Sequence, residues 1–209
     1  MRFTKLGEVK CIKRIGDNVW VAQGNQIYVF DSKGEQIDLL THSTSVTQFF
    51  PLSSSKKSNV LTVTSQSVGV WRQKSDKTRC DLVDKFSVED TLSSIYVSSL
   101  VDYLWIGSGQ KLLVCNPHSK FSVVKEFEKK VVWMAYEHGT LWTMDSSGDL
   151  EVFDPISFET LLKASLPDTN PIHLSYLAKK NAFILFAEKH VLAFHSTPLY
   201  FARRVKFEM

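Results

Sequence analysis

Apolar and polar positions alternate along this chain in a pattern that recurs five times. Each copy has an apolar pair that begins a strand, a short polar turn, a second alternating strand and a polar residue that ends it. The copies span residues 19–31, 60–72, 104–117, 141–155 and 183–196. Alternation with a period of two is typical of β-strands with one buried face, and the short polar turns predict hairpins.

The spacing of the copies predicts the fold. Between the anchors Trp20, Leu61, Trp105, Trp142 and Ile184 the intervals are 41, 44, 37 and 42 residues. A repeat of about 40 residues with a hairpin in each copy is typical of a β-propeller, in which every blade is a four-stranded sheet.

We therefore predict an all-β chain that folds as a single β-propeller domain of about five four-stranded blades over residues 1–209. The predicted repeats lie approximately at residues 9–41, 42–88, 89–128, 129–166 and 167–209. Both ends of the chain offer an outer strand for the same blade, in MRFTKL and ARRVKF. This surplus leaves open the alternative that the chain belongs to a larger ring.

The second repeat resembles the WD40 family. His42, Val46 and Pro51 fall where that family places the histidine of its entering loop, the valine of its first strand and the proline that follows. Trp71 matches the tryptophan of the family's characteristic ending, and Arg72 replaces the usual aspartate. The resemblance implies a divergent WD40-like propeller, of the kind found alone or attached to signalling enzymes. It also implies a non-catalytic role as a cytoplasmic scaffold for protein partners.

Tryptophans recur at one register of the repeat, at Trp20, Trp105 and Trp142. Recurrence at the repeat period is what packing between neighbouring sheets requires, because large aromatic side chains dominate such cores. We interpret these three tryptophans, together with His42 and Trp71, as structural repeat positions.

Candidate catalytic chemistry is sparse. The six histidines show no metal-ligand spacing, and no nucleophile or phosphate-loop motif is present. Asp145 and Asp149 flank a polar turn, but the apolar Leu150 and Val152 that follow favour a hairpin over a calcium loop. We expect no enzyme, no cofactor and no metal. An enzyme with a site at the central opening of a propeller stays an alternative, with His173 as the one histidine on a predicted inner strand.

Composition is that of an ordinary globular protein, with 44% hydrophobic and 22% charged residues. No apolar run is long enough to cross a bilayer, and the start of the chain lacks the apolar region of a signal peptide. The three cysteines have no pairing or metal-binding spacing, which favours a reducing, intracellular location.

The placement of charge is more informative than the net charge of +3. In a propeller, the turns between first and second strands and between third and fourth strands lie on one face. We name as the basic face the positive residues of those turns, which are Lys33, Lys56, Lys57, Arg72, Lys74, Lys120, Lys179 and Lys180. Such a face predicts an acidic partner, either a protein or a phosphoinositide membrane. Nucleic acid is disfavoured, because no aromatic side chains interleave with these lysines.

Overall fold

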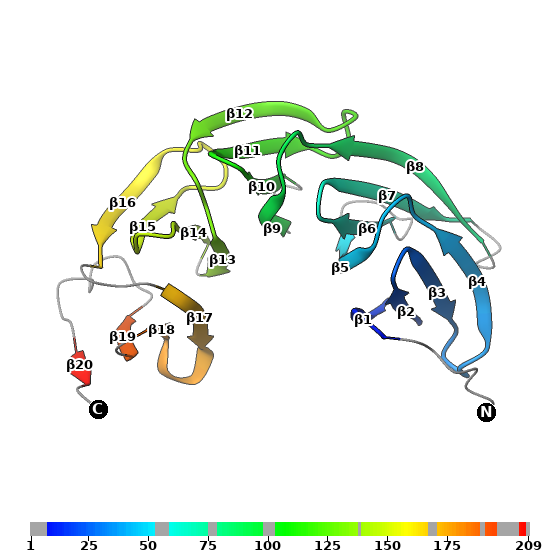
Figure 1. Ribbon diagram of the computed structural model, residues 1–209, viewed down its shortest axis with the longest axis horizontal. Coiled ribbons are helices and arrows are strands. Elements are labelled where there is room, and N and C mark those ends of the chain that lie inside the picture. Colours follow the sequence, from blue (N-terminus) through cyan, green and yellow to red (C-terminus); the bar gives the residue numbers. More distant parts are fainter. Residues whose placement is uncertain are drawn as a thin grey trace. The chain divides into compact units, whose positions relative to one another are not determined.

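The computed structural model describes residues 8–52, 59–74, 79–97, 103–137, 139–166, 171–188, 191–195 and 205–207 (Figure 1). Of residues 171–174, 178, 194, 195 and 205–207 it describes the backbone alone. These residues form strands, turns and one short 3-10 helix, arranged as five four-stranded sheets.

In each sheet the strands are neighbours in chain order, as Figure 1 shows for β5 to β8. The first sheet comprises β1 (Cys11–Ile15), β2 (Asn18–Gln23), β3 (Gln26–Phe30) and β4 (Gln36–Thr41). The second comprises β5 (Val46–Leu52), β6 (Asn59–Thr64), β7 (Ser67–Gln73) and β8 (Cys80–Ser87). The third comprises β9 (Leu92–Val97), β10 (Leu104–Ser108), β11 (Lys111–Asn116) and β12 (Ser122–Glu128).

The fourth sheet comprises β13 (Trp133–Glu137), β14 (Thr140–Met144), β15 (Asp149–Phe153) and β16 (Thr160–Ser165). The fifth comprises β17 (Pro171–Leu177), β18 (Ala182–Ala187), β19 (Val191–His195) and β20 (Val205–Phe207), with the 3-10 helix η1 (Ala178–Lys180) between β17 and β18. The all-β prediction is thereby confirmed, and each predicted repeat contains one antiparallel four-stranded sheet.

The chain divides into two compact units. One contains residues 1–92, 102–104 and 114–124, and the other contains residues 93–101, 105–113 and 125–209. The first and second sheets thus belong to the first unit, the fourth and fifth sheets belong to the second unit, and residues of the third sheet are divided between both. The single-domain assignment stays a prediction.

Burial follows the position of a strand within its sheet. Every residue of β6 is buried, whereas most residues of the outer strand β8 are half-buried or exposed. Tight turns join the strands, and Gly16 and Gly24 adopt positive φ angles of 61° and 58° in the first two hairpins. Glycine is favoured there because hairpin turns of this kind require the left-handed region.

Each unit has its own aromatic core. In the first unit Trp20 meets Phe49 edge to face, with ring centroids 6.0 Å apart, so the first and second sheets pack through these rings. In the second unit Trp142 packs on Phe183 at 4.8 Å, which joins the fourth and fifth sheets. Aromatic pairs of this kind contribute about 0.5–1.5 kcal/mol beyond their buried area.

Candidate functional site

A pocket with a cavity volume of about 260 Å³ lies within the first unit. Its walls come from the second sheet and from the turn between β11 and β12. We name it the basic pocket, and its lining residues are Leu52, Asn59, Val70, Arg72, Val83, Asp84, Pro117, His118 and Lys120. The floor is apolar and the cations lie at exposed positions, so a ligand can reach both.

Arg72 enters the basic pocket from β7, one residue after the buried Trp71. Its Nε donates a hydrogen bond to Oδ1 of Asn59, at 3.4 Å, and Asn59 lies directly opposite it on β6. Asn59 is buried, so the amide holds the guanidinium group from its inner side. The two terminal NH₂ groups of Arg72 are left as the donors that a ligand can engage.

Lys120 lies in a tight turn with an unusual backbone. Both Lys120 and Phe121 have positive φ angles, of 50° and 53°, although neither is a glycine. Phe121 is buried and packs against Phe86, with ring centroids 5.7 Å apart, which anchors the turn. Left-handed conformations at such residues cost about 1–2 kcal/mol each, and strain of this kind concentrates at functional sites.

The electrostatics of the basic pocket are positive on balance. Arg72 and Lys120 each carry one positive charge, and no carboxylate of the described residues pairs with either. Asp84 supplies one negative charge, and its Oδ1 accepts a hydrogen bond from the backbone N–H of Lys85. His118 adds an imidazole that can donate or accept. The pocket therefore suits an anionic group with a hydrogen-bond donor beside it.

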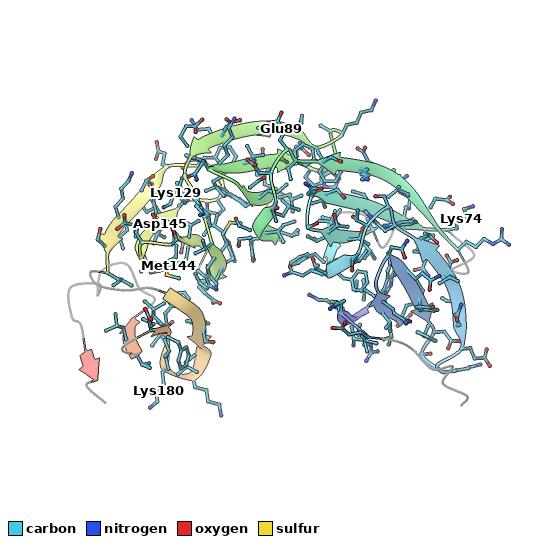
Figure 2. All side chains as sticks on the ribbon, viewed as in Figure 1. Lys74, Glu89, Lys129, Met144, Asp145 and Lys180 are labelled. Carbon is cyan, nitrogen blue, oxygen red and sulfur yellow. The ribbon has the colours of Figure 1, made fainter. Side chains whose placement is uncertain are left out.

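The other members of the predicted basic face are distributed differently. Lys33 lies in the turn between β3 and β4, away from the pocket lining. Lys74, which Figure 2 labels, directly follows β7 and pairs with Asp81 at 3.2 Å. Lys179 and Lys180 lie in η1 of the second unit, and Lys56 and Lys57 lie outside the described residues. The structure thus brings Arg72 and Lys120 together, and the basic face as a whole stays a prediction.

His42, which precedes β5, and Trp71, on β7, both lie close to the paired residues Thr62 and Gly69 of the second sheet. The indole Nε1 of Trp71 donates to Oγ1 of Thr62 at 3.0 Å, and a Cβ on Gly69 would lie 3.2 Å from Nε2 of His42. His42 is buried, and its Nε2 has no hydrogen-bond partner in the part of the chain that the structure describes. Burial first, and then the positive charge of Lys85, lower the pKa of His42. The neutral imidazole is therefore the favoured form at this position.

The three recurring tryptophans are all buried, with 2% or less of their surface exposed. Trp105 contacts Phe127, Phe153 and Phe158 at centroid distances of 5.7–6.2 Å. The indole Nε1 of Trp142 donates to Oγ1 of Thr140 at 3.0 Å. These rings pack within the protein and do not form an exposed ligand cage.

A second group of charges lies in the second unit, on β15. The carboxylate of Glu151 pairs with Lys129 at 2.7 Å and with Lys163 at 3.0 Å, and accepts a hydrogen bond from Thr160 at 2.8 Å. We name these four residues the ion cluster. Burial alone would raise the pKa of Glu151, but the hydrogen bonds from Lys129, Lys163 and Thr160 outweigh it and lower that pKa. Lys129 and Glu151 expose only 15% and 11% of their side chains, so this is a structural ion pair.

The cysteine and polar-turn positions have structural roles. Burial raises the pKa of Cys80 and of Cys115 to about 12, so neither thiol is an activated nucleophile. Asp145 accepts hydrogen bonds from the backbone N–H groups of Ser147 and Asp149, both at 2.9 Å, as a polar hairpin turn does (Figure 2). Within the residues that the structure describes, no three histidine, cysteine or acidic side chains gather as metal ligands. No helix found there combines the length and apolarity of a membrane span.

Sequence analysis alone did not find Asn59, Asp84 and His118 as residues of a site. They come from a strand end, an outer strand and a turn, and only pairing between strands brings them near Arg72 and Lys120. The ion cluster was missed for a similar reason. Glu151 lies in the third strand of its repeat, DLEVF, and its position between the apolar Leu150 and Val152 was the only available signal.

Comparisons with known proteins add no relative. No protein-family model matches this chain, and no curated protein matches it. Function is therefore argued from the residues of the basic pocket.

Proposed function

We propose that this chain is a non-catalytic interaction module, a divergent WD40-like β-propeller whose basic pocket binds an acidic segment of a partner protein. One observation carries the proposal. Arg72 on β7 and Lys120 in the turn between β11 and β12 line one concave pocket and have no carboxylate partner among the described residues. Cations without partners that converge on a pocket are suited to an anionic ligand, since bridging them costs no existing ion pair.

The propeller assignment rests on the repeat and on the second sheet. Five successive antiparallel sheets, each with its four strands in chain order, support it. The hydrogen bond from Trp71 to Thr62, with His42 close to Gly69 in the same sheet, supports the WD40-like resemblance, because that family bonds its tryptophan to a hydroxyl residue in a network that also contains a histidine and an aspartate. A reducing cytoplasmic location is part of the proposal, and the three free cysteines agree with it.

A protein partner is favoured over a membrane by the shape of the site. A bilayer surface is best met by cations spread over a broad face, whereas Arg72 and Lys120 line one cavity of about 260 Å³. Of the other lysines of the predicted basic face, Lys33 lies outside the pocket lining and Lys74 is paired with Asp81, and the remaining four lie either in the second unit or outside the described residues. A scaffold that binds an acidic segment is therefore the simpler function.

The test is fluorescence anisotropy of the full chain with a labelled peptide rich in aspartate and glutamate. We expect binding that falls about tenfold when Arg72 and Lys120 are both replaced by glutamine, as loss of close charge pairs predicts. The double variant Lys125→Gln with Lys130→Gln removes two charges from exposed positions outside the pocket and is the matched control. Equal losses in both variants would show that only net charge matters, and would contradict the proposal.

A further inference from the structure

The donor groups of the basic pocket have the geometry of a phosphate site. Nε of Arg72 donates to Asn59 at 3.4 Å, which leaves the two terminal nitrogens of the guanidinium group as a fork for a ligand. Such a fork matches two oxygens of one phosphate, and the ammonium of Lys120 supplies a second cation to the same cavity. His118 provides an imidazole on the same wall as Lys120.

The charge balance distinguishes a phosphate from a carboxylate. Arg72, Lys120 and Asp84 sum to one positive charge, so a single carboxylate gains less net attraction than a group that carries two negative charges. A phosphate monoester carries about −1.5 to −2 charges and three acceptor oxygens, which allows it to engage both cations at once. Asp84 can then accept a hydrogen bond from an N–H group of the ligand, as a peptide backbone offers.

The backbone of the turn supplies an independent observation. Lys120 is held in the left-handed region at a φ of 50°, where glycine would be favoured. The buried Phe121 fixes this conformation, so the strain persists while the side chain of Lys120 lines the pocket. A strained lysine at a site where glycine would fit better is explained if its ammonium is needed there.

We propose that the basic pocket binds a phosphate monoester presented by a peptide, which means a phosphoserine or phosphothreonine side chain. This inference rests on the proposed function, because it names the acidic group of the partner segment. A pocket of about 260 Å³ is smaller than those that enclose drug-sized ligands, and it fits one modified side chain with its neighbouring backbone.

The experiment compares three degenerate peptide libraries that differ only in a central serine, phosphoserine or glutamate, captured by the full immobilised chain. We expect the phosphoserine library to be retained at least about tenfold more than the glutamate library, because charge-assisted bonds to a dianion are the stronger. Equal retention of phosphoserine and glutamate would overturn the phosphate inference but leave the proposed function standing. Retention of neither library would overturn both.

Variants and a lipid probe sharpen the result. Arg72→Lys keeps the charge but removes the fork, so we expect about a tenfold loss of phosphoserine binding, while Lys130→Gln should change nothing. Full binding by Arg72→Lys would contradict the forked contact. Vesicles containing phosphatidylinositol phosphates are the second probe, and their capture in preference to the phosphopeptides would overturn the assignment to a peptide.

Discussion

The second and fourth sheets place different residues at one equivalent position, the residue of the third strand that lies opposite a threonine of the second strand. In both, a threonine on the second strand donates its hydroxyl to the carbonyl oxygen opposite it on the third strand. Thr62 bonds to Gly69 at 3.4 Å, and Thr143 bonds to Glu151 at 3.1 Å. Strand pairing places both threonines directly opposite these partners, so Gly69 and Glu151 occupy equivalent positions.

The surroundings of the two positions also correspond. His42 precedes β5 by the same number of residues as Lys129 precedes β13, and each approaches the third-strand position of its own sheet. On the fourth strand, Lys85 lies opposite Gly69 and Lys163 lies opposite Glu151. The same geometry thus holds a neutral histidine over a glycine in one sheet and a paired glutamate in the other.

The comparison of the two sheets helps to distinguish charged residues that stabilise the fold from charged residues that can bind a ligand. The lysine of the fourth strand disfavours protonation of His42 in the second sheet, whereas its counterpart favours ionisation of Glu151 in the fourth. Glu151 is thus held as an ion pair within its sheet, and His42 is held in its neutral form. The basic pocket differs from both, since neither Arg72 nor Lys120 is paired with a described carboxylate. Charge that is left unpaired in the fold is the charge available to a partner.

The largest effect is expected for Glu151→Gln. This change leaves Lys129, with only 15% of its side chain exposed, as a buried cation without its counter-ion. Because removing one member of a buried pair is strongly unfavourable, we expect the free energy of unfolding to fall by about 2–3 kcal/mol. Urea denaturation measures it. Lys163→Gln is the control, because that side chain is 74% exposed and should cost at most about 0.5 kcal/mol. Equal losses would show that burial does not distinguish the two lysines.

Gly69→Ala should have the next largest effect. The added Cβ would lie 2.9 Å from Oγ1 of Thr62 and 3.2 Å from Nε2 of His42, closer than normal contacts allow. We expect a loss of about 1–2 kcal/mol in the free energy of unfolding, as for overpacked cores. The double variant with His42→Ala should recover part of this loss in a double-mutant cycle. Strict additivity would mean that His42 does not crowd the position.

A smaller effect separates the two sheets by pH. Burial and Lys85 lower the pKa of His42 in the folded protein below 6.5, its value in the unfolded chain. As pH falls below 6.5 the unfolded chain therefore binds more protons than the folded protein, and the free energy of unfolding decreases. The pKa of Glu151 lies below 4.5, so its contribution is present above that value and is lost only as pH falls through the folded pKa. Denaturation at a series of pH values should show both losses. His42→Gln should remove the loss that begins as pH falls below 6.5, and Glu151→Gln the loss at more acidic pH; persistence of either loss in its variant would reject that assignment.

The sequence predicts the strands well because their signal is local. Alternation and turn residues fix each hairpin, and the copies around Trp20 and Trp142 fall on the second and third strands of their sheets. His42 and Trp71 were found through a resemblance, but Thr62, which accepts the hydrogen bond of Trp71, was not, since a threonine in a buried strand has no distinguishing pattern. Local sequence patterns therefore predict the strands, but only some of the side chains that interact within each sheet.

The basic pocket could be predicted only in part. Arg72 and Lys120 were named from charge and from the expected turns, yet nothing local indicates that they meet each other rather than Lys74. Which of these cations lacks an ion pair depends on Asp81, which pairs with Lys74, and the position of Arg72 depends on its hydrogen bond to Asn59. Contacts between residues far apart in the chain decide which charges remain available, and a single sequence does not display them.

The smallest effect on stability, and the sharpest on function, is expected for Lys120→Gly. Glycine adopts a φ of 50° without steric cost, so relief of strain should slightly exceed the added freedom of the unfolded chain. We expect thermal denaturation to show a gain of at most about 0.5 kcal/mol, while phosphopeptide binding falls about tenfold. Lys120→Ala is the matched control, because it removes the same ammonium but keeps the strain, and should lose binding without gaining stability. If both variants bind the phosphopeptide normally, the ammonium group of Lys120 has no part in recognition. The argument that cations without a carboxylate partner in the fold are those that bind a ligand would then be rejected for Lys120.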